Sequence, residues 1–508
     1  MIIEALIAVA FVSSLVVMAS PDEYAGKLAA ALSLLPVVGS LWMWSRFDAG
    51  GNALTGGAIA FETQTSWLEV AGYQIQWFVG VDGISLPLVV LTAMLTTLAI
   101  VSAWTPIDSR QSQFYGLMLF MEANLLGVFT ALDFFVWFVF WEAVLVPMYF
   151  LIGVWGGPRR KYAAIKFFVY TNVASLAMFI GFIALVYGLG DSISTLGLPE
   201  IAMALRESGT LASFYGLGPG ALRAAAFVAM FFGFAVKVPV APLHTWLPDA
   251  HVEAPTPVSV MLAGVLLKMG TYALLRYNFT MLPDTARSFA VPIAVLAVVS
   301  VVYGAMLALA QEDLKRIVAY SSVSSMGYVI LGLIAYTEYG VGGATFQMVA
   351  HGLISGLMFM AVGVIYNVTH TRMLGDMSGM ADRMPVTVGI LVAGAFGYMG
   401  LPLMAGFAAE FFVFVGSFGS TALPSAPLFT ATAMFGIVVV AGYLLYAMQR
   451  SLFGSFEYDG DYEVSRADLH DTAPLAVLLL AVIALGVSPE LFFDMIQNAV
   501  APLVGGGA

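Results

Sequence analysis

Four ionisable residues lie within long apolar stretches of the sequence: Glu142, Lys237, Lys268 and Glu410. Lipid does not solvate charged groups, so such residues are rare in apolar segments and usually mark ion or proton pathways. Sodium would favour clustered carboxylates and carbonyls as ligands, whereas alternating lysine and carboxylate groups suit the transfer of protons. We therefore hypothesise that these four side chains form a proton relay.

The depth of these residues supports the hypothesis. Lys237 follows Arg223 by fourteen residues and Lys268 follows Pro257 by eleven, which places them roughly 21 Å and 16 Å along their helices. Snorkelling does not easily carry Lys268 to either membrane interface from that depth. The alternatives left open are a packing role for Glu142 and a permanent buried ion pair for Lys237.

Proline interrupts two of the apolar stretches close to one of these charges. In FAVKVPVAPLHTWLPDAHVEAPTP, Lys237 is followed by Pro239 and Pro242, and the segment GLPLMAG around Pro402 precedes Glu410. Broken helices are tolerated in a membrane only where protein or water covers the freed backbone groups. Such breaks in the two halves of a chain indicate an ion site, so we expect each break to lie beside a relay residue.

Further candidates are weaker. His351 can relay a proton near pH 7, with a packed, hydrogen-bonded histidine as the alternative. Glu122 and His244 are secondary candidates for the relay. Lys166 lies only six residues after Arg160, which favours snorkelling to the nearer face of the membrane.

The composition predicts an all-α polytopic membrane protein. Of 508 residues, 61% are hydrophobic and 10% are charged, whereas soluble domains carry about 25% charged residues. The apolar stretches are continuous rather than alternating, so they predict helices of about 20 residues and not a barrel. We predict about fourteen spans, near 2–20, 28–45, 84–104, 114–132, 134–155, 163–189, 224–247, 257–277, 289–310, 314–336, 343–367, 386–416, 427–449 and 473–495.

The interrupted spans, the seventh and the twelfth, lie five apart and predict two five-helix units of opposite orientation. The predicted regions are the first three spans at 1–112, a first repeat at 113–277, a second, inverted repeat at 289–449, and a C-terminal loop with the last span at 450–508. The two longest loops lie near 46–83 and 190–222, with a short surface helix at 199–208.

Loop cations predict the orientation. With the N-terminus outside, the cytoplasmic segments hold Lys27, Arg110, Arg159, Arg160, Lys161, Lys315, Arg316, Arg372, Arg383, Arg450 and Arg466. The outer segments hold Arg46, Arg206, Arg223, Arg276 and Arg287. This excess of inner cations predicts that both termini lie on the outer face.

Several chemistries have no support in the sequence. The absence of cysteine excludes disulfides, thiolate-held iron–sulfur clusters and haem attached through cysteine. The five histidines are too scattered to indicate a metal site, and the net charge of −12 does not favour nucleic-acid binding. We expect no cofactor in this chain.

The segment PLHTWLPDAHVEAPTPVSVMLAGVLLKMGTYALLR at 242–276 resembles the signature of the antiporter-like subunits of respiratory complex I. The resemblance extends over essentially the whole chain, including QEDLKRIVAYSSVSSMGY and MVAHGLISGLMFM. Glu410, where most paralogues have lysine, is similar to the M-type subunit, chain 4 in mitochondria. The resemblance implies a proton-translocating subunit of a bacterial NADH–quinone oxidoreductase in the inner membrane, with periplasmic termini.

The resemblance also implies residue roles. Glu142 would pair with Lys237, Lys268 would be the central relay residue and Glu410 the terminal proton site toward the outer face. Many relatives have histidine where this chain has Ser325, and a serine cannot carry charge.

The same resemblance implies that FMN, iron–sulfur clusters and quinone belong to partner subunits, with paralogous antiporter-like subunits on either side. A subunit of a multi-component sodium/proton antiporter and a structural scaffold remain the alternatives.

Overall fold

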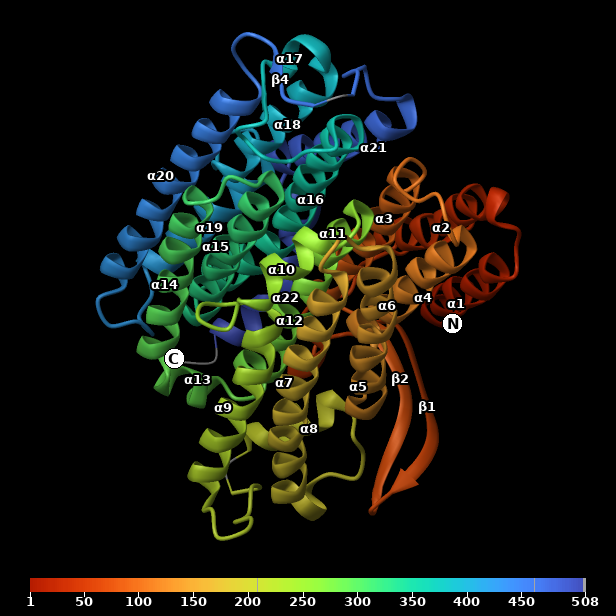
Figure 1. Ribbon diagram of the computed structural model, residues 1–508. Helices are drawn as coiled ribbons and strands as arrows, with labels where there is room; N and C mark the ends of the chain where they lie inside the picture. Colours follow the sequence, from red (N-terminus) through yellow and green to blue (C-terminus); the bar gives the residue numbers. More distant parts are fainter. Residues whose placement is uncertain (208, 461, 506–508) are drawn as a thin grey trace.

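Apolar stretches of the sequence form helices that pack side by side in the computed structural model, which describes residues 1–207, 209–460 and 462–505 (Figure 1). The first region contains α1 (Ile2–Met18), α2 (Asp22–Ser45), the short η1 (Ala53–Thr55), α3 (Ser85–Ser102) and α4 (Gln111–Thr130). Between η1 and α3, strands β1 (Ala60–Val70) and β2 (Tyr73–Val81) pair as an antiparallel hairpin. The segment 46–83, predicted as a long loop between two spans, therefore contains a β-hairpin that the sequence analysis did not predict.

The middle region follows the predicted order of spans. It comprises α5 (Phe134–Ala143), α6 (Leu145–Trp155), α7 (Arg160–Leu189), η2 (Gly190–Ser192), α8 (Leu198–Arg206), α9 (Pro219–Lys237), α10 (Trp246–Glu253), α11 (Thr256–Met261), η3 (Leu262–Leu266), α12 (Leu267–Ala273) and η4 (Leu274–Thr280). The short helix expected at 199–208 is confirmed as α8 up to Arg206, and residue 208 lies outside the described residues.

The last region contains α13 (Pro283–Ser288), α14 (Ala290–Leu309), α15 (Leu314–Ile334), α16 (Glu338–Thr369), β3 (Met377–Ser378), α17 (Met380–Arg383), α18 (Pro385–Tyr398), α19 (Ala405–Phe418), α20 (Ala426–Ser451), β4 (Glu457–Tyr458), α21 (Leu469–Val487) and α22 (Glu490–Val504). The expected last span at 473–495 is wrong at its C-terminal end. Ser488 and Pro489 end α21, and α22 begins with a new turn.

Eleven helical stretches among the described residues are long and apolar enough to cross a membrane, while α1, α18 and α19 are shorter apolar helices. The predicted interruptions are confirmed: α9 and α10 replace one continuous helix, and so do α18 and α19. The predicted total of fourteen spans stays a prediction, since α4 coincides with an expected span but is not among the eleven. The repeat boundaries also stay predictions.

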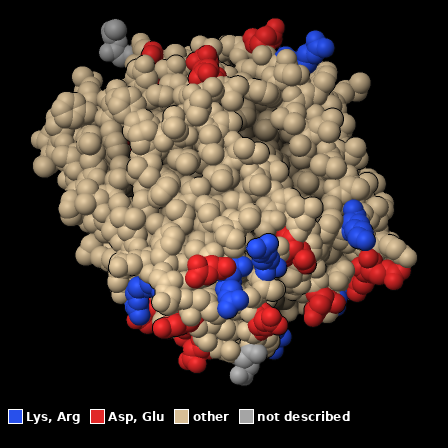
Figure 2. All heavy atoms as spheres, turned by 90° about the horizontal axis from the view of Figure 1, so that it is seen from above, with Lys and Arg blue, Asp and Glu red and all other residues tan. Residues whose placement is uncertain are grey.

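The centre of the bundle consists of α16 and the stretch Thr256–Thr280, both fully buried in their apolar windows. Figure 2 shows one face of the surface, where charged side chains gather at the margins and leave a broad area without charged residues between them. An apolar belt between two charged rims is the surface expected of a chain that lies across a bilayer.

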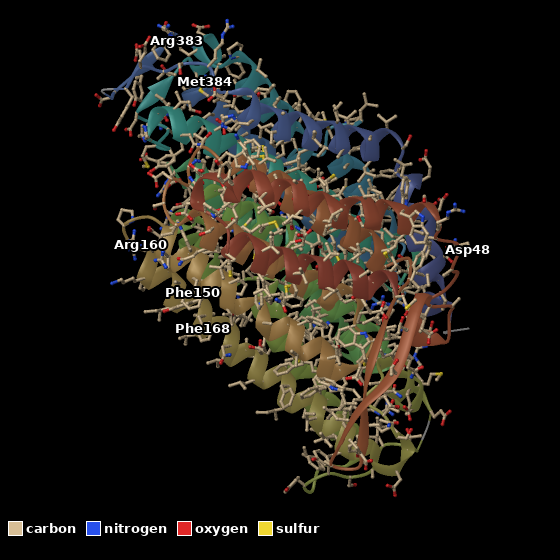
Figure 3. All side chains as sticks on the ribbon, turned by 90° about the vertical axis from the view of Figure 1, so that its right-hand side faces the viewer. Asp48, Phe150, Arg160, Phe168, Arg383 and Met384 are labelled. Atoms are coloured by element: carbon tan, nitrogen blue, oxygen red, sulfur yellow. The ribbon has the colours of Figure 1, made fainter. Side chains whose placement is uncertain are left out.

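Both ends of the chain lie on the face that carries the hairpin, which we call the hairpin face. The Met1 amino group donates to Thr63 Oγ1 of β1 at 2.9 Å, and Trp44 Nε1 donates to the Leu491 carbonyl at 3.2 Å. Figure 3 shows Arg160 and Arg383 at one end of the helices and Asp48 at the other. Met1 and the start of α22 therefore lie on the hairpin face, and the predicted sidedness of the two termini stays a prediction.

Candidate functional site

The first break lies directly after Lys237. Residues 238–245, with Pro239 and Pro242, separate α9 from α10. The backbone groups freed by the break find partners within the chain: Trp246 Nε1 donates to the Val236 carbonyl at 2.9 Å, and the Ala241 amide donates to Ser300 Oγ at 3.0 Å. Satisfied backbone groups explain how the break persists inside an apolar bundle.

The ammonium of Lys237 is buried among aromatic rings. Its Nζ lies 5.0 Å from the centre of the Trp141 ring and 5.9 Å from that of Phe167, a cation–π geometry that partly replaces lost hydration. Glu142 follows Trp141 on α5, is only partly buried, and accepts a hydrogen bond from Asn172 Nδ2 at 3.3 Å.

Glu142 and Lys237 interact through their charges without a salt bridge between them among the described residues. The direct pairing implied by family resemblance is therefore not formed in this structure.

Lys268 lies at the centre of the bundle and has two partners. Its Nζ donates to the Ala263 carbonyl at 2.7 Å and lies 2.6 Å from His351 Nδ1 on α16. Ala263 belongs to η3, a π-helical turn, and such turns often occur at functional sites because they displace carbonyls from the regular helical ladder. The structure thus brings together two predicted relay residues, Lys268 and His351, and adds a backbone carbonyl that the sequence pattern did not indicate.

Helix α12 also packs closely on the end of α9. A Cβ added to Gly270 would lie 3.0 Å from the Val238 nitrogen and 3.2 Å from the Lys237 carbonyl carbon. Only a glycine permits this approach, because the obstacle is backbone. The two buried lysines therefore lie on helices whose backbones touch.

From His351 the line of contacts extends toward the second break. Its Nε2 lies 3.5 Å from the hydroxyl of Tyr398, the last residue of α18. The Tyr398 hydroxyl also interacts with Ser322 and Ser355. Sequence reasoning missed Tyr398, although its position directly before the GLPLMAG interruption was a usable signal.

Glu410 lies on α19, six residues after Met404 ends the second break. Its side chain is buried and points back to the break: a Cβ on Gly400, whose φ is +65°, would lie 2.5 Å from Glu410 Oε2. Pro402 lies in the same break, as predicted. Glycine at 400 supplies both the left-handed backbone and the space that the carboxylate occupies.

Two buried tyrosines surround Glu410 and were also missed. Tyr328 of α15 and Tyr443 of α20 both interact with its charge. The Tyr443 hydroxyl donates to Ser321 Oγ at 2.6 Å, and the Tyr328 hydroxyl donates to the Ala433 carbonyl at 3.3 Å.

The secondary candidates lie apart from this line. Glu122 of α4 is fully buried and neither carboxylate oxygen has a hydrogen-bond partner among the described residues. His244 is buried in the first break, with its ring centre 5.7 Å from that of Tyr303 and 6.1 Å from that of Tyr320. Ser325, where many relatives carry histidine, is buried within α15.

Lys166 is held by partners from α10, and its predicted snorkelling to the nearer face stays a prediction. Its Nζ bonds Asp249 Oδ2 at 2.7 Å and the Thr245 carbonyl at 2.9 Å, and Arg316 Nη2 reaches the same aspartate at 3.3 Å. Asp249 thus ties α10 to α7 and α15. The sequence showed no sign of this role for Asp249, because its two partners, Lys166 and Arg316, lie on other helices and come close to it only in the folded chain.

Arg276, assigned from the sequence to an outer loop, is instead buried in η4. Its guanidinium forms a two-armed pair with Asp82, with Nη2–Oδ1 at 2.6 Å and Nη1–Oδ2 at 2.8 Å. Burial by itself raises the pKa of Asp82, but the opposite charge and hydrogen bonds of Arg276 outweigh it and hold that pKa below its usual range. The pair fixes the loop before α3 against the helix that carries Lys268.

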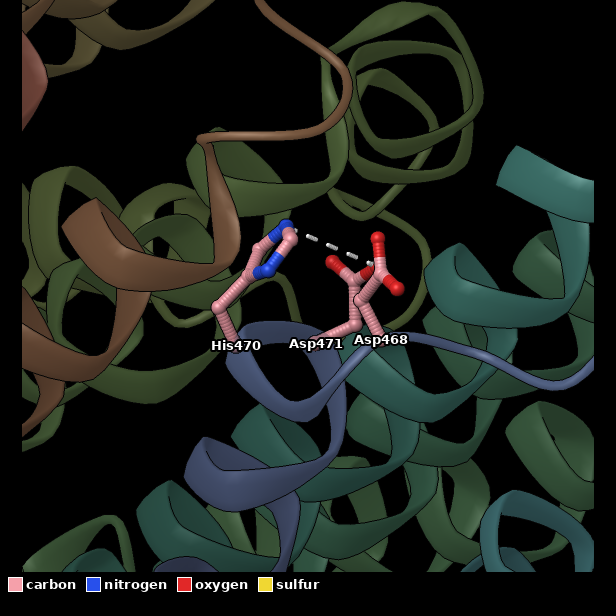
Figure 4. Close-up of side chains that lie close together, drawn as sticks. All are labelled: Asp468, His470 and Asp471. Carbon is pink, nitrogen blue, oxygen red and sulfur yellow. Dashed lines mark ion pairs between the residues drawn. The ribbon is translucent and has the colours of Figure 1, made fainter.

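Asp468, His470 and Asp471 have ligand-type atoms within 4.8 Å of one another (Figure 4). Asp468 is the N-cap of α21 and Asp471 lies in its first turn, where carboxylates are favoured and cations disfavoured by the helix dipole. The Thr105 hydroxyl bonds Asp471 at 2.9 Å and His470 Nε2 at 2.8 Å. The helix dipole therefore favours the two carboxylates of this cluster, and the Thr105 hydroxyl holds Asp471 and His470 together.

Comparison with known proteins identifies the chain's relatives. Residues 131–436 match the family NADH:quinone oxidoreductase/Mrp antiporter, TM. The chain is 40% identical to F(420)H(2) dehydrogenase subunit M of Methanosarcina mazei, over 90% of this chain and 89% of that protein. It is 37% identical to NADH-quinone oxidoreductase subunit M of Rhodobacter capsulatus, over 95% and 91% of the two chains.

Among solved structures, a chain of respiratory complex I from Thermus thermophilus superimposes with a TM-score of 0.85 at 26% identity and covers both chains completely. The extent of the family match and the identity to these relatives leave one conclusion: the chain belongs to the NADH:quinone oxidoreductase/Mrp antiporter transmembrane family.

Proposed function

We propose that this chain is a proton-translocating membrane subunit of an NADH–quinone oxidoreductase, equivalent to subunit M or chain 4. The observation that carries the proposal is the buried contact between Lys268 Nζ and His351 Nδ1, 2.6 Å apart at the centre of the bundle. A lysine and a histidine at that distance can hand one proton between them, whereas a purely structural pair would be better served by opposite charges.

In the proposed relay, a proton passes between Lys237 and Lys268 and then through His351 and Tyr398 to Glu410. Hydrogen-bonding contacts support the middle of this route, and the touching backbones of α9 and α12 support its start. Lys237 Nζ and Glu410 Oε2 are buried without hydrogen-bond partners among the described residues. Buried polar atoms of this kind are normally satisfied by water, so we expect water to complete both ends.

The driving event is proposed to act through Glu142. Its side chain is only partly buried although it lies within an apolar span, so a neighbouring subunit can change the charge near it. A change in the electrostatic potential at Glu142 alters the stability of the protonated form of Lys237 inside the bundle. Moving one charge against 100 mV costs about 2.3 kcal/mol, which a buried charge pair can supply.

Relatives in this family are parts of multi-subunit membrane complexes, and the chain is a multi-pass membrane protein. We propose that paralogous antiporter-like subunits flank it in a bacterial inner membrane, with the hairpin face and both termini periplasmic. FMN, iron–sulfur clusters and quinone would belong to partner subunits, since this chain has no cysteine to hold a cluster.

The second candidate is a subunit of a sodium/proton antiporter, which the family description includes. Sodium would favour clustered carboxylates. Among the described residues, the only close group of three acidic or histidine side chains is Asp468–His470–Asp471, which lies at the start of α21, outside the relay. Protons therefore fit the buried site better.

The test is proton translocation by the assembled complex in proteoliposomes, with Lys268→Met compared with the exposed control Lys27→Met. We expect Lys268→Met to lower the number of protons moved per electron while the complex still assembles, and Lys27→Met to leave it unchanged. Normal pumping by Lys268→Met would support a scaffold and contradict the relay. Sodium-dependent flux would favour the antiporter.

A further inference from the structure

Three arginines from different elements line one hollow on the hairpin face. Arg206 ends α8, Arg223 lies in the first turn of α9 and Arg287 lies in α13, around a space of about 440 Å³. The acidic side chains beside them are Glu207 and Asp284. Cations therefore outnumber anions in a hollow that opens at the rim of the apolar belt.

The arginines are only partly engaged. Arg287 forms a salt bridge of 3.3 Å with Asp284, whose side chain is 95% exposed. The Arg287 guanidinium also lies 4.6 Å from the centre of the Tyr336 ring. Arg206 Nη2 donates to the Thr280 carbonyl at 2.9 Å. Arg223 forms no salt bridge in the part of the chain that the structure describes. Donors from Arg223 and Arg287 thus remain for an anion.

An apolar groove of about 140 Å³ lies farther along the same two elements. Phe227 and Phe231 of α9 form one wall, and Phe289, Ile293 and Leu296 at the start of α14 form the other. Phe227 and Phe289 stack with ring centres 5.5 Å apart, and both line the groove. The groove has almost no polar lining, so it suits hydrocarbon.

The hollow and the groove are aligned along the helices. Arg223, Phe227 and Phe231 recur every four residues and therefore share one face of α9. Phe231 lies about 12 Å along the helix from Arg223. On the other wall, Arg287 in α13 comes directly before Phe289 and the start of α14, which carries Ile293 and Leu296. A cationic hollow followed by an apolar groove at this spacing has the shape of a headgroup site above an acyl-chain site.

We propose that this combined surface binds one anionic diacyl phospholipid. Its phosphate would accept hydrogen bonds from Arg223 and Arg287, and the upper part of one acyl chain would lie between α9 and α14. Charge selects the headgroup and the groove selects a lipid over a soluble phosphate. Because α9 carries Lys237 at its other end, the bound lipid would steady the helix that begins the relay.

The experiment uses the purified complex reconstituted in nanodiscs with a phosphatidylglycerol that carries a photoreactive diazirine on one acyl chain. We expect cross-linked peptides from α9 and the start of α14. Arg223→Gln and Arg287→Gln should each reduce this labelling about fivefold, the usual contribution of one arginine at an anionic lipid surface. Arg46→Gln, an exposed arginine on the same face, should not change it.

Three results would overturn the proposal. Equal labelling by a phosphatidylcholine with the same chain would mean unselective boundary lipid. Loss of labelling on adding excess inorganic phosphate would mean a soluble anion site. Cross-links from Arg223 or Arg287 to another subunit, without lipid labelling, would mean a protein interface. Size-exclusion elution of each variant with the intact complex ensures that lost labelling is not lost folding.

Discussion

The two broken helices differ in where the charge lies and in what covers the break. In α9–α10, Lys237 precedes the break and the loop is mostly buried, with its backbone groups bonded to Trp246 and Ser300. In α18–α19, Glu410 follows the break, and the loop residues are exposed, with Leu403 at 64%. The first break is closed by the chain itself, whereas the second lies open on its surface.

This difference indicates how each break is used. The amides of Gly400, Leu401 and Met404 are also bonded within the chain, so the second break differs from the first in the exposure of its loop side chains and not in its backbone hydrogen bonds. The first break is more enclosed and holds a cation in a fixed aromatic setting. We call Lys237 at the first break the internal station of the relay and Glu410 at the second break its peripheral station. His351 and Tyr398 lie between them.

The largest predicted effect concerns the anchoring of the first half. Asp82→Asn leaves the buried Arg276 charge without its partner, and breaking a buried pair in this way costs about 3–5 kcal/mol. We expect this loss in the free energy of unfolding measured by SDS titration in micelles. The exposed Asp284→Asn should change it little. The double variant Asp82→Leu/Arg276→Met should recover most of the loss, and failure to do so would show that packing, not charge, dominates.

Two glycine substitutions, one beside each break, should have smaller effects and should distinguish the two breaks. Gly270→Ala places a Cβ against the backbone of Val238 and should lower the unfolding free energy by about 1–3 kcal/mol. In Gly400→Ala the new Cβ contacts the flexible end of the Glu410 side chain. The left-handed backbone at this position adds a strain of about 1 kcal/mol. This substitution should therefore reduce proton pumping more than stability. The reverse order of effects would contradict the difference between the breaks.

Tyr398→Phe tests the link between the stations. The substitution removes one hydroxyl between His351 and Glu410 and keeps the ring. One hydrogen bond of about 1 kcal/mol corresponds to roughly a fivefold slower proton transfer. Pumping rates in proteoliposomes should fall accordingly, while Tyr446→Phe on the exposed side of α20 should have no effect. An unchanged rate for Tyr398→Phe would remove this residue from the route.

The smallest effect is a dependence on acidity. Because the pKa of Asp82 is depressed in the folded chain, its pair with Arg276 contributes stability that is fully present above the unfolded pKa of about 4. That stability is lost as the pH falls through the lower folded value. Acid unfolding should therefore weaken the wild type more steeply than the Asp82→Leu/Arg276→Met variant. Parallel acid profiles would contradict the assignment.

Sequence reasoning predicted most of the fold because apolar length and proline breaks are local signals. The interruptions beside Lys237 and Glu410 were confirmed in this way. The β hairpin at 60–81 was missed because its surroundings were taken as a loop, and α22 because its apolar residues continued the preceding span. The sequence counted Arg276 among the outer cations but did not indicate its burial, because its partner Asp82 is distant in sequence.

The candidate site was only partly predictable. Lys268 and His351 are conspicuous as charged or titratable groups in apolar helices, and the structure brings them into contact. Tyr328, Tyr398 and Tyr443 are ordinary residues for a membrane helix, so nothing local separates a tyrosine in a relay from one in a core. Only the fold brings Tyr398 within 3.5 Å of His351, and Tyr328 and Tyr443 within electrostatic reach of Glu410.

The central claim is that both breaks belong to one proton route. The most direct test measures protons moved per electron in proteoliposomes for Lys237→Met, Glu410→Gln and the double variant, since residues of one pathway are not additive. We predict that each single variant loses the same share of pumping and that the double variant loses no more. A double variant that loses the sum of the two, or a single variant that loses nothing, would contradict the claim.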